Sequence, residues 1–117
     1  MRNYKELKIW QMGFDIAIAT YGLSKELPSD EKYGLKSQVN RAAVSIPSNI
    51  AEGSSRSSDK ANRQFVEFAL GSAFELETQL LIIKELKMAS SEKVNNLLSM
   101  VQMEQKMVSG FIGKLKA

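Results

Sequence analysis

The chain has 117 residues, with 16 Lys and Arg against 13 Asp and Glu, and its formal net charge is +3 at pH 7. Since globular domains usually contain roughly 100–150 residues, residues 1–117 are predicted to form a single domain. The chain contains neither Cys nor His. This composition excludes disulfides, thiolate nucleophiles, Ser-His-Asp triads and metal sites built from those residues, and we expect no cofactor and no metal.

The first predicted helix covers residues 6–26. Apolar residues repeat there at spacings of three and four, in one stripe from Leu7 to Tyr21 and in a second from Met12 to Leu23. Pro28 ends this helix, and Ser29 after it is a favoured N-cap. Core packing is the predicted role of four aromatic residues, as opposed to base stacking: Trp10, Phe14, Tyr21 and Phe65.

A second helix is predicted from Ser29 to Gly53. Pro47 lies inside it and lacks the N–H that would bond to the carbonyl four residues back, so a kink near Pro47 is expected. Gly53 is predicted to end this helix as its C′ residue. Residues 53–58 read Gly-Ser-Ser-Arg-Ser-Ser and are predicted to form a loop within the domain.

Two more helices are predicted, over residues 58–87 and from residue 90 to the C-terminal region. Four helices joined by short loops predict an all-α, up-down-up-down antiparallel four-helix bundle. Its length should be about 35 Å at ~1.5 Å per residue. Because the longest aliphatic run has only four residues and no apolar leader is visible, we expect a cytoplasmic protein that makes no use of a membrane.

The spacing Ser-x-x-Lys occurs three times, beginning at Ser29, Ser57 and Ser90. Some acyl-transfer enzymes use this pair as nucleophile and base, but their accompanying Ser-Asp-Asn and Lys-Thr-Gly motifs are absent here. Since all three serines lie at predicted helix starts, we interpret them as helix caps. No catalytic residue is predicted, and a Ser-Lys hydrolase is the least favoured alternative.

Positive charge is predicted to gather at one end of the bundle. If the helices alternate in direction, the first helix starts, the fourth ends and the second and third are joined at the same end. Eight cationic side chains then face three acidic ones, Glu6, Glu52 and Asp59. Such an end favours contact with phosphate backbones, although ordinary surface charge kept for solubility is the alternative. The candidate nucleic-acid-binding residues are Arg2, Lys5, Lys8, Arg56, Lys60, Arg63, Lys114 and Lys116.

Antiparallel pairing of the first two helices places Arg41 level with Asp15, and an ion pair between them is predicted.

The apolar residues of the helices also predict a homo-oligomer. The first helix has two apolar stripes, whereas one stripe is enough to fill the core of a lone bundle. The third helix adds further apolar residues beside its main stripe: Val66, Leu70, Ala73 and Phe74.

Residues 33–53 read YGLKSQVNRAAVSIPSNIAEG and closely resemble the signature of bacterial four-helix bundle proteins encoded in intervening sequences of 23S rRNA genes. Residues 7–11 and 69–80 extend the resemblance over nearly the whole chain. It implies a small cytoplasmic bundle that assembles as a pentameric ring, similar in fold to the accessory variability protein of retroelements, which partners a reverse transcriptase and binds nucleic acid. Where that family commonly has consecutive arginines, this chain has Asn40 and Arg41. The resemblance supplies no catalytic residue.

These observations together predict a non-enzymatic, oligomeric protein that associates with nucleic acid through the basic end of the bundle. The genomic setting of the resembled family favours RNA over DNA. The alternative is an oligomeric adaptor that binds a protein partner and makes no contact with nucleic acid.

Overall fold

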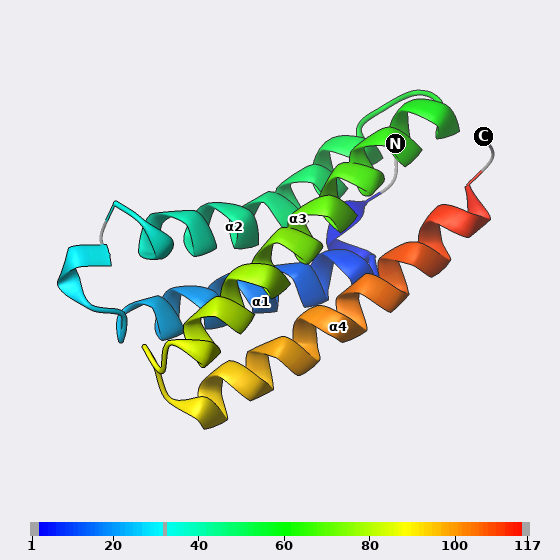
Figure 1. The fold of residues 1–117 in the computed structure, drawn as a ribbon. Helices are drawn as coiled ribbons and strands as arrows, with labels where there is room; N and C mark the ends of the chain where they lie inside the picture. The colour runs from blue at the N-terminus through cyan, green and yellow to red at the C-terminus, as the bar shows by residue number, and fades with distance from the viewer. Residues whose placement is uncertain (1–2, 32, 116–117) are drawn as a thin grey trace.

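A computed structural model describes residues 3–31 and 33–115, which form four long α-helices and two short 3-10 helices (Figure 1). In chain order the elements are η1 (Tyr4–Glu6), α1 (Lys8–Ser24), η2 (Ser29–Glu31), α2 (Leu35–Ser54), α3 (Asp59–Glu85) and α4 (Ser91–Lys114).

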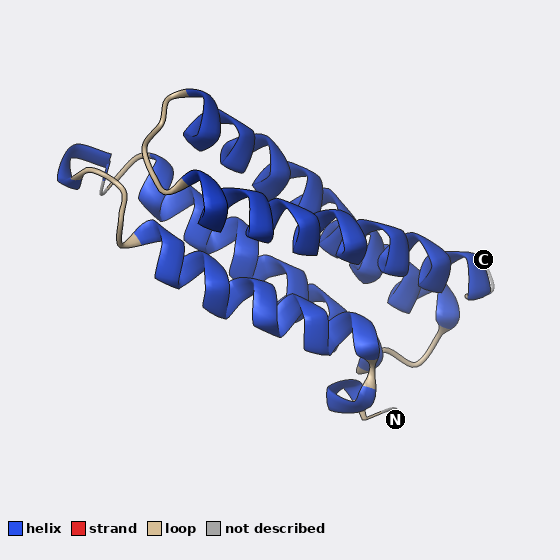
Figure 2. Cartoon of the chain, turned by 90° about the horizontal axis from the view of Figure 1, so that it is seen from below, coloured by secondary structure: helices blue, strands red, loops and turns tan. Residues whose placement is uncertain are grey.

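The α-helices run alternately up and down an elongated bundle (Figures 1 and 2). Each helix packs against two others, in the pairs α1–α2, α2–α3, α3–α4 and α1–α4. The predicted antiparallel four-helix bundle is therefore confirmed. The molecule measures 43 × 23 × 21 Å and is longer than expected, because α3 alone contains 27 residues.

All four helices contribute fully buried aliphatic side chains to one core, including Ile16 from α1, Ile46 from α2, Leu76 from α3 and Val101 from α4. Burying a side chain of this size contributes about 1.5–3 kcal/mol, so this core is the main source of stability. Among the described helices, none combines the length and the apolar character needed to cross a membrane.

The face that α1 buries takes Ile16 and Leu23 from the second of the two predicted stripes, and it also takes Ala17 from the first. Ile16 and Leu23 are at most 3% exposed, whereas Phe14 is 45% and Tyr21 48% exposed. The prediction that Phe14 and Tyr21 pack in the core is therefore wrong. Gly13 also lies on the buried face of α1. With this face inward, Phe14 and Tyr21 lie at the outer edge between α1 and α2.

The structure also tests the predicted core role of Trp10 and Phe65 and the predicted interface role of Val66 and Ala73. Trp10 and Phe65 are half-buried. Val66 and Ala73, which the sequence suggested as surplus apolar residues for an interface, are fully buried inside the bundle. The exposed apolar residues on α3 are therefore a different set from the one expected. Phe74 is 50% exposed as the sequence suggested, and Phe68, Leu81 and Ile82 are 41–50% exposed.

Serine side chains cap two of the helices. Ser58 accepts a hydrogen bond from the N–H of Ala61 at the start of α3, and Ser90 accepts one from Lys93 at the start of α4. Ser29 instead begins the short η2. The predicted start of α2 at Ser29 is wrong, since α2 begins at Leu35, whose N–H donates to the Glu31 carboxylate.

The α-helix α2 continues through Pro47 to Ser54, and the kink near Pro47 stays a prediction. The expected role of Gly53 as a C′ residue is wrong, because Gly53 is buried within the last turn of α2. A Cβ atom at Gly53 would lie 2.6 Å from Oδ1 of Asn62 and 3.0 Å from the Asn62 carbonyl oxygen. Glycine is needed there because α2 and α3 approach closely.

We expect Gly53→Ala to lower the free energy of unfolding by about 1–3 kcal/mol, since the added methyl group overlaps the backbone of Asn62. Urea unfolding followed by circular dichroism measures this change. Gly71→Ala is the matched control, because nothing lies within 4 Å of a Cβ at Gly71. It should raise stability by up to about 1 kcal/mol through helix propensity. Equal effects of the two substitutions would contradict the close-approach argument.

Candidate functional site

The chain ends and the α2–α3 loop lie together at one end of the bundle (Figures 1 and 2). We call this the basic end, because described cations from three separate segments of the chain gather there. Two further predicted cations, Arg2 and Lys116, lie outside the described residues. The described cations of the basic end are Lys5, Lys8, Arg56, Lys60, Arg63 and Lys114.

Two arginines of the basic end pair with carboxylates four residues away in the sequence. Arg56 donates to Glu52 over 2.6 Å, and its guanidinium lies 4.5 Å from the centre of the Phe65 ring. Arg63 pairs with Glu67 at 3.7 Å. Because an exposed ion pair contributes little free energy, both arginines can exchange partners. In the structure their positive charge is nonetheless partly compensated by Glu52 and Glu67. Glu67 was not among the acidic residues that the sequence placed at this end.

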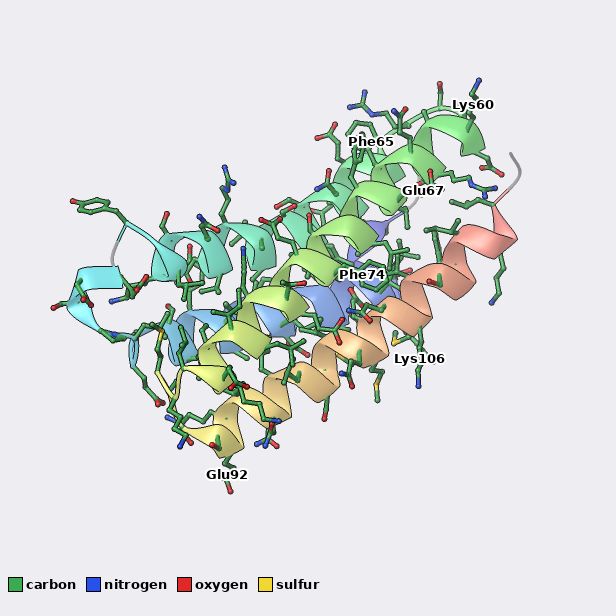
Figure 3. The ribbon with its side chains drawn as sticks, viewed as in Figure 1. Lys60, Phe65, Glu67, Phe74, Glu92 and Lys106 are labelled. Atoms are coloured by element: carbon green, nitrogen blue, oxygen red, sulfur yellow. The ribbon has the colours of Figure 1, made fainter. Side chains whose placement is uncertain are left out.

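Lysines of the basic end are less compensated. No ion pair within the described chain involves Lys8, Lys60 or Lys114. Figure 3 shows Lys60 projecting outward from the first turn of α3, beyond Phe65 and Glu67.

The start of α1 and the end of α4 enclose a hollow of about 350 Å³ that the sequence reasoning missed. Its lining includes Lys8, Lys106 and Lys114 and contains no acidic side chain. Figure 3 shows Lys106 pointing away from the bundle on α4. Lys106 lies two turns before Lys114 on the same helix, and this spacing is the sequence signal that could have revealed it. We call this feature the lysine hollow.

The opposite end of the bundle is organised by one acidic residue. Glu26 accepts hydrogen bonds from the Lys93 ammonium at 2.6 Å and from the Ser90 N–H at 3.0 Å. These bonds, with that to Lys93 the larger cause, lower the pKa of Glu26, and the same contact raises the pKa of Lys93. The contact joins the turn after α1 to the start of α4. It compensates the charge of Lys93, whereas Lys8, Lys60 and Lys114 at the basic end have no such partner in the described chain.

The ion pair predicted between Asp15 and Arg41 is absent from the structure. Both side chains are exposed, and the described residues hold no ion pair within 4.0 Å between them. Placing two helices level along the bundle axis leaves open how each is rotated about its own axis. Arg41 instead lines a hollow on α2 together with Lys36.

A buried carboxyl group lies in the centre of the bundle and was also missed. Glu104 of α4 is 0% exposed, and neither of its carboxyl oxygens has a hydrogen-bond partner. A Cβ at Gly13 would lie 3.0 Å from Oε2 of Glu104 and 3.4 Å from the nitrogen of Pro47, which cannot donate. Burial raises the pKa of Glu104 to about 8. The group is therefore mostly protonated at neutral pH.

Neither acidic nor serine residues form a recognisable reaction centre in the described part of the chain. No group of three or more acidic residues there has an arrangement that could hold a metal ion. Of the three serines interpreted as helix caps, Ser90 caps α4, whereas the cap of α3 is Ser58 and the prediction for Ser29 and Ser57 is wrong. Ser29 and Ser57 are exposed. The chemistry that this surface offers is electrostatic attraction of anions by lysine and arginine.

A family model described as 23S rRNA-intervening sequence protein matches residues 5–110 of the chain. The fold is similar to that in a crystal structure of a protein with unknown function from the S23 ribosomal protein family of Bacteroides thetaiotaomicron. The TM-score is 0.82 at 21% sequence identity, and the match covers 89% of this chain and 97% of that one. No curated protein matches the chain.

We expect stability to fall as pH rises from about 4.5 to about 8. The unfolded chain loses the Glu104 proton near the ordinary pKa of 4.5, whereas the folded protein keeps it until about pH 8. The contribution of this proton to stability is thus complete below the pKa of Glu104 in the unfolded chain. It is lost as pH rises through the pKa of Glu104 in the folded protein. Each pKa unit corresponds to about 1.4 kcal/mol, so the loss is on the order of 5 kcal/mol. Urea unfolding at a series of pH values measures it.

Glu104→Gln is the control for this pH dependence, because glutamine keeps the size of the side chain and cannot ionise. Its unfolding free energy should change much less between pH 5 and about 8 than that of the unmodified protein. Parallel pH profiles for the two proteins would show that Glu104 does not carry the effect.

Proposed function

Because the chain belongs to the 23S rRNA-intervening sequence protein family, we propose that it is a non-enzymatic, homo-oligomeric protein that associates with RNA through the basic end. The observation that carries this proposal is the lysine hollow, whose three lysines come from two distant segments and whose lining contains no acidic side chain. RNA is preferred over DNA because the family is described by its ribosomal RNA setting.

Attraction to phosphate is the physical basis of the proposed association. Each lysine that contacts a phosphate releases condensed counterions, which supplies affinity without reading the base sequence. Lys8, Lys106 and Lys114 are suited to this role since they line one concave surface, where positive potential is concentrated. Lys60, at the start of α3, adds a further positive charge to the basic end (Figure 3).

The absence of Cys and His from the sequence supports a non-enzymatic role. His is the most frequent general acid or base in enzymes and Cys is a strong nucleophile, and the serines at two helix starts already serve as caps.

Exposed apolar surface supports the homo-oligomer. A groove of about 400 Å³ runs between α1 and α2, and its lining includes Phe14, Ile18, Tyr21 and Val44, which are 41–62% exposed. A separate apolar surface on α3 includes Phe74, which Figure 3 shows on the side of α3 near α4. Monomeric proteins rarely leave such apolar groups uncovered.

We infer that a second copy covers the part of the α1–α2 groove around Phe14 and Ile18, since the chain itself supplies an apolar surface on α3. Helices α1 and α3 lie diagonally across the bundle, so the two surfaces face in different directions. Contact between different surfaces of identical subunits is head-to-tail, and it forms a ring when the rotation from one subunit to the next closes. The family resemblance favours five subunits, and a ring would repeat the basic end around one rim.

We expect the triple variant Lys8→Glu, Lys106→Glu and Lys114→Glu to lose RNA binding. Fluorescence anisotropy with a structured RNA fragment over a salt series measures this. The slope of log affinity against log salt should fall by about 0.7–0.9 for each phosphate contact removed. A smaller loss is expected on reversing Arg56, Lys60 and Arg63, because two of these residues already have carboxylate partners.

The matched control reverses three lysines at the opposite end, Lys25, Lys84 and Lys87, and alters the net charge equally. RNA binding by this control should change little. Equal losses from the control and the lysine-hollow variant would show non-specific attraction. No RNA binding by the unmodified protein at about 50 mM salt would contradict the proposal and favour an adaptor that binds a protein partner.

We expect the unmodified protein to exceed its chain mass of 13.1 kDa in light scattering at micromolar concentration. Ile18→Glu should shift the mass toward the monomer, because Ile18 is the most exposed residue of the groove at 62% and would place a charge in the interface. Leu86→Glu, at a position 57% exposed outside the groove, is the control. A monomeric unmodified protein would refute the oligomer.

A further inference from the structure

A hollow of about 630 Å³ opens on the side of the bundle between the end of α1 and the first half of α2. Its lining includes Lys36 and Arg41, both from α2, and Tyr21 from α1. It is separate from the basic end, which lies where α2 ends and α1 begins. We call it the α2 hollow.

The α2 hollow carries uncompensated positive charge. No Asp or Glu lines it, and neither Lys36 nor Arg41 belongs to any ion pair of the described chain. The two residues are five apart on one helix, a rise of about 7.5 Å and a turn of about 140°, so they border the hollow from its two sides and both long side chains can extend over it. The guanidinium of arginine presents paired N–H donors that match two phosphate oxygens.

The other residues that line the α2 hollow suit an uncharged part of the same ligand. Tyr21 is 48% exposed, so its ring offers a face on which a base can stack. Ser37 supplies a hydroxyl group. Asn40 also lines the hollow, and the amide group of its side chain can hydrogen-bond to a hydroxyl group. A ligand with a phosphate, an aromatic ring and hydroxyl groups satisfies all of these side chains.

We propose that the α2 hollow binds a nucleotide, with the phosphate on Lys36 and Arg41 and the base against Tyr21. Such a nucleotide has two possible sources, a free mononucleotide or one unit of single-stranded RNA. Either source presents the same phosphate, ribose and base. The site goes beyond the basic end in what it recognises, because the basic end attracts phosphate alone.

Titration of the full chain with adenosine 5′-monophosphate (AMP), followed by amide chemical shifts, tests the site. Shifts should concentrate at residues 36–45 of α2 and around Tyr21. Ribose 5-phosphate and inorganic phosphate should bind about tenfold or more weakly than AMP, because they lack the stacking base. Inorganic phosphate binding as tightly as AMP, or no AMP binding at all, would overturn the proposal.

Variants locate the contacts. Lys36→Gln and Arg41→Gln should each weaken AMP binding about tenfold, since each removes a charge-assisted hydrogen bond. Tyr21→Leu should weaken AMP and leave ribose 5-phosphate unaffected. Lys25→Gln, outside the hollow, is the matched control and should bind AMP normally. An equal loss in this control, or an Arg41→Gln protein with altered mass and unaltered AMP affinity, would overturn the proposal.

Two further measurements separate the sources and the two binding surfaces. A short single-stranded RNA that displaces AMP from the α2 hollow identifies RNA as a source, and failure to displace it identifies free nucleotides. The triple variant of the lysine hollow should keep its AMP affinity. Failure of the basic end and failure of the α2 hollow are therefore distinguishable, and loss of AMP binding in that triple variant would count against a separate site.

Discussion

Two glycines on buried helix faces set how closely the helices of this bundle approach one another. Gly13 brings α1 against Ile46 and Pro47 of α2 and against Glu104 of α4, and Gly53 brings α2 against α3. A side chain at either position would need space that a close-packed core does not have. The rotation of each helix about its axis follows from these contacts, and so does the choice of side chains that remain outside.

The surface of the molecule depends on that choice. Because α1 turns Gly13 and Ile16 inward, its aromatic stripe is left along the α1–α2 edge, where it forms the apolar groove. The same rotation leaves Arg41 without Asp15, and Arg41 lines a hollow together with Lys36 of its own helix. One packing arrangement thus creates an apolar surface and a cationic hollow that adjoin each other at Tyr21.

Burial of the Glu104 carboxyl group costs free energy of folding. Glu104 is fully buried, and neither of its carboxyl oxygens has a hydrogen-bond partner among the described residues. Protonation lowers this cost, because a neutral carboxyl group is easier to bury than a charged one. The basic end follows a different logic, since its charges remain in water and are available to partners.

The sequence by itself determined the helical fold, the antiparallel order and the gathering of cations at one end. Proline, serine and apolar spacing are local signals, and chain direction alone decides which ends meet. Only the tertiary structure decided which stripe of α1 is buried, that Gly53 serves close packing, that Glu104 is enclosed and that Lys106 joins Lys8 and Lys114. These outcomes depend on helix rotation, which is fixed by contacts between residues far apart in the chain and which apolar periodicity leaves open wherever a helix has two apolar stripes.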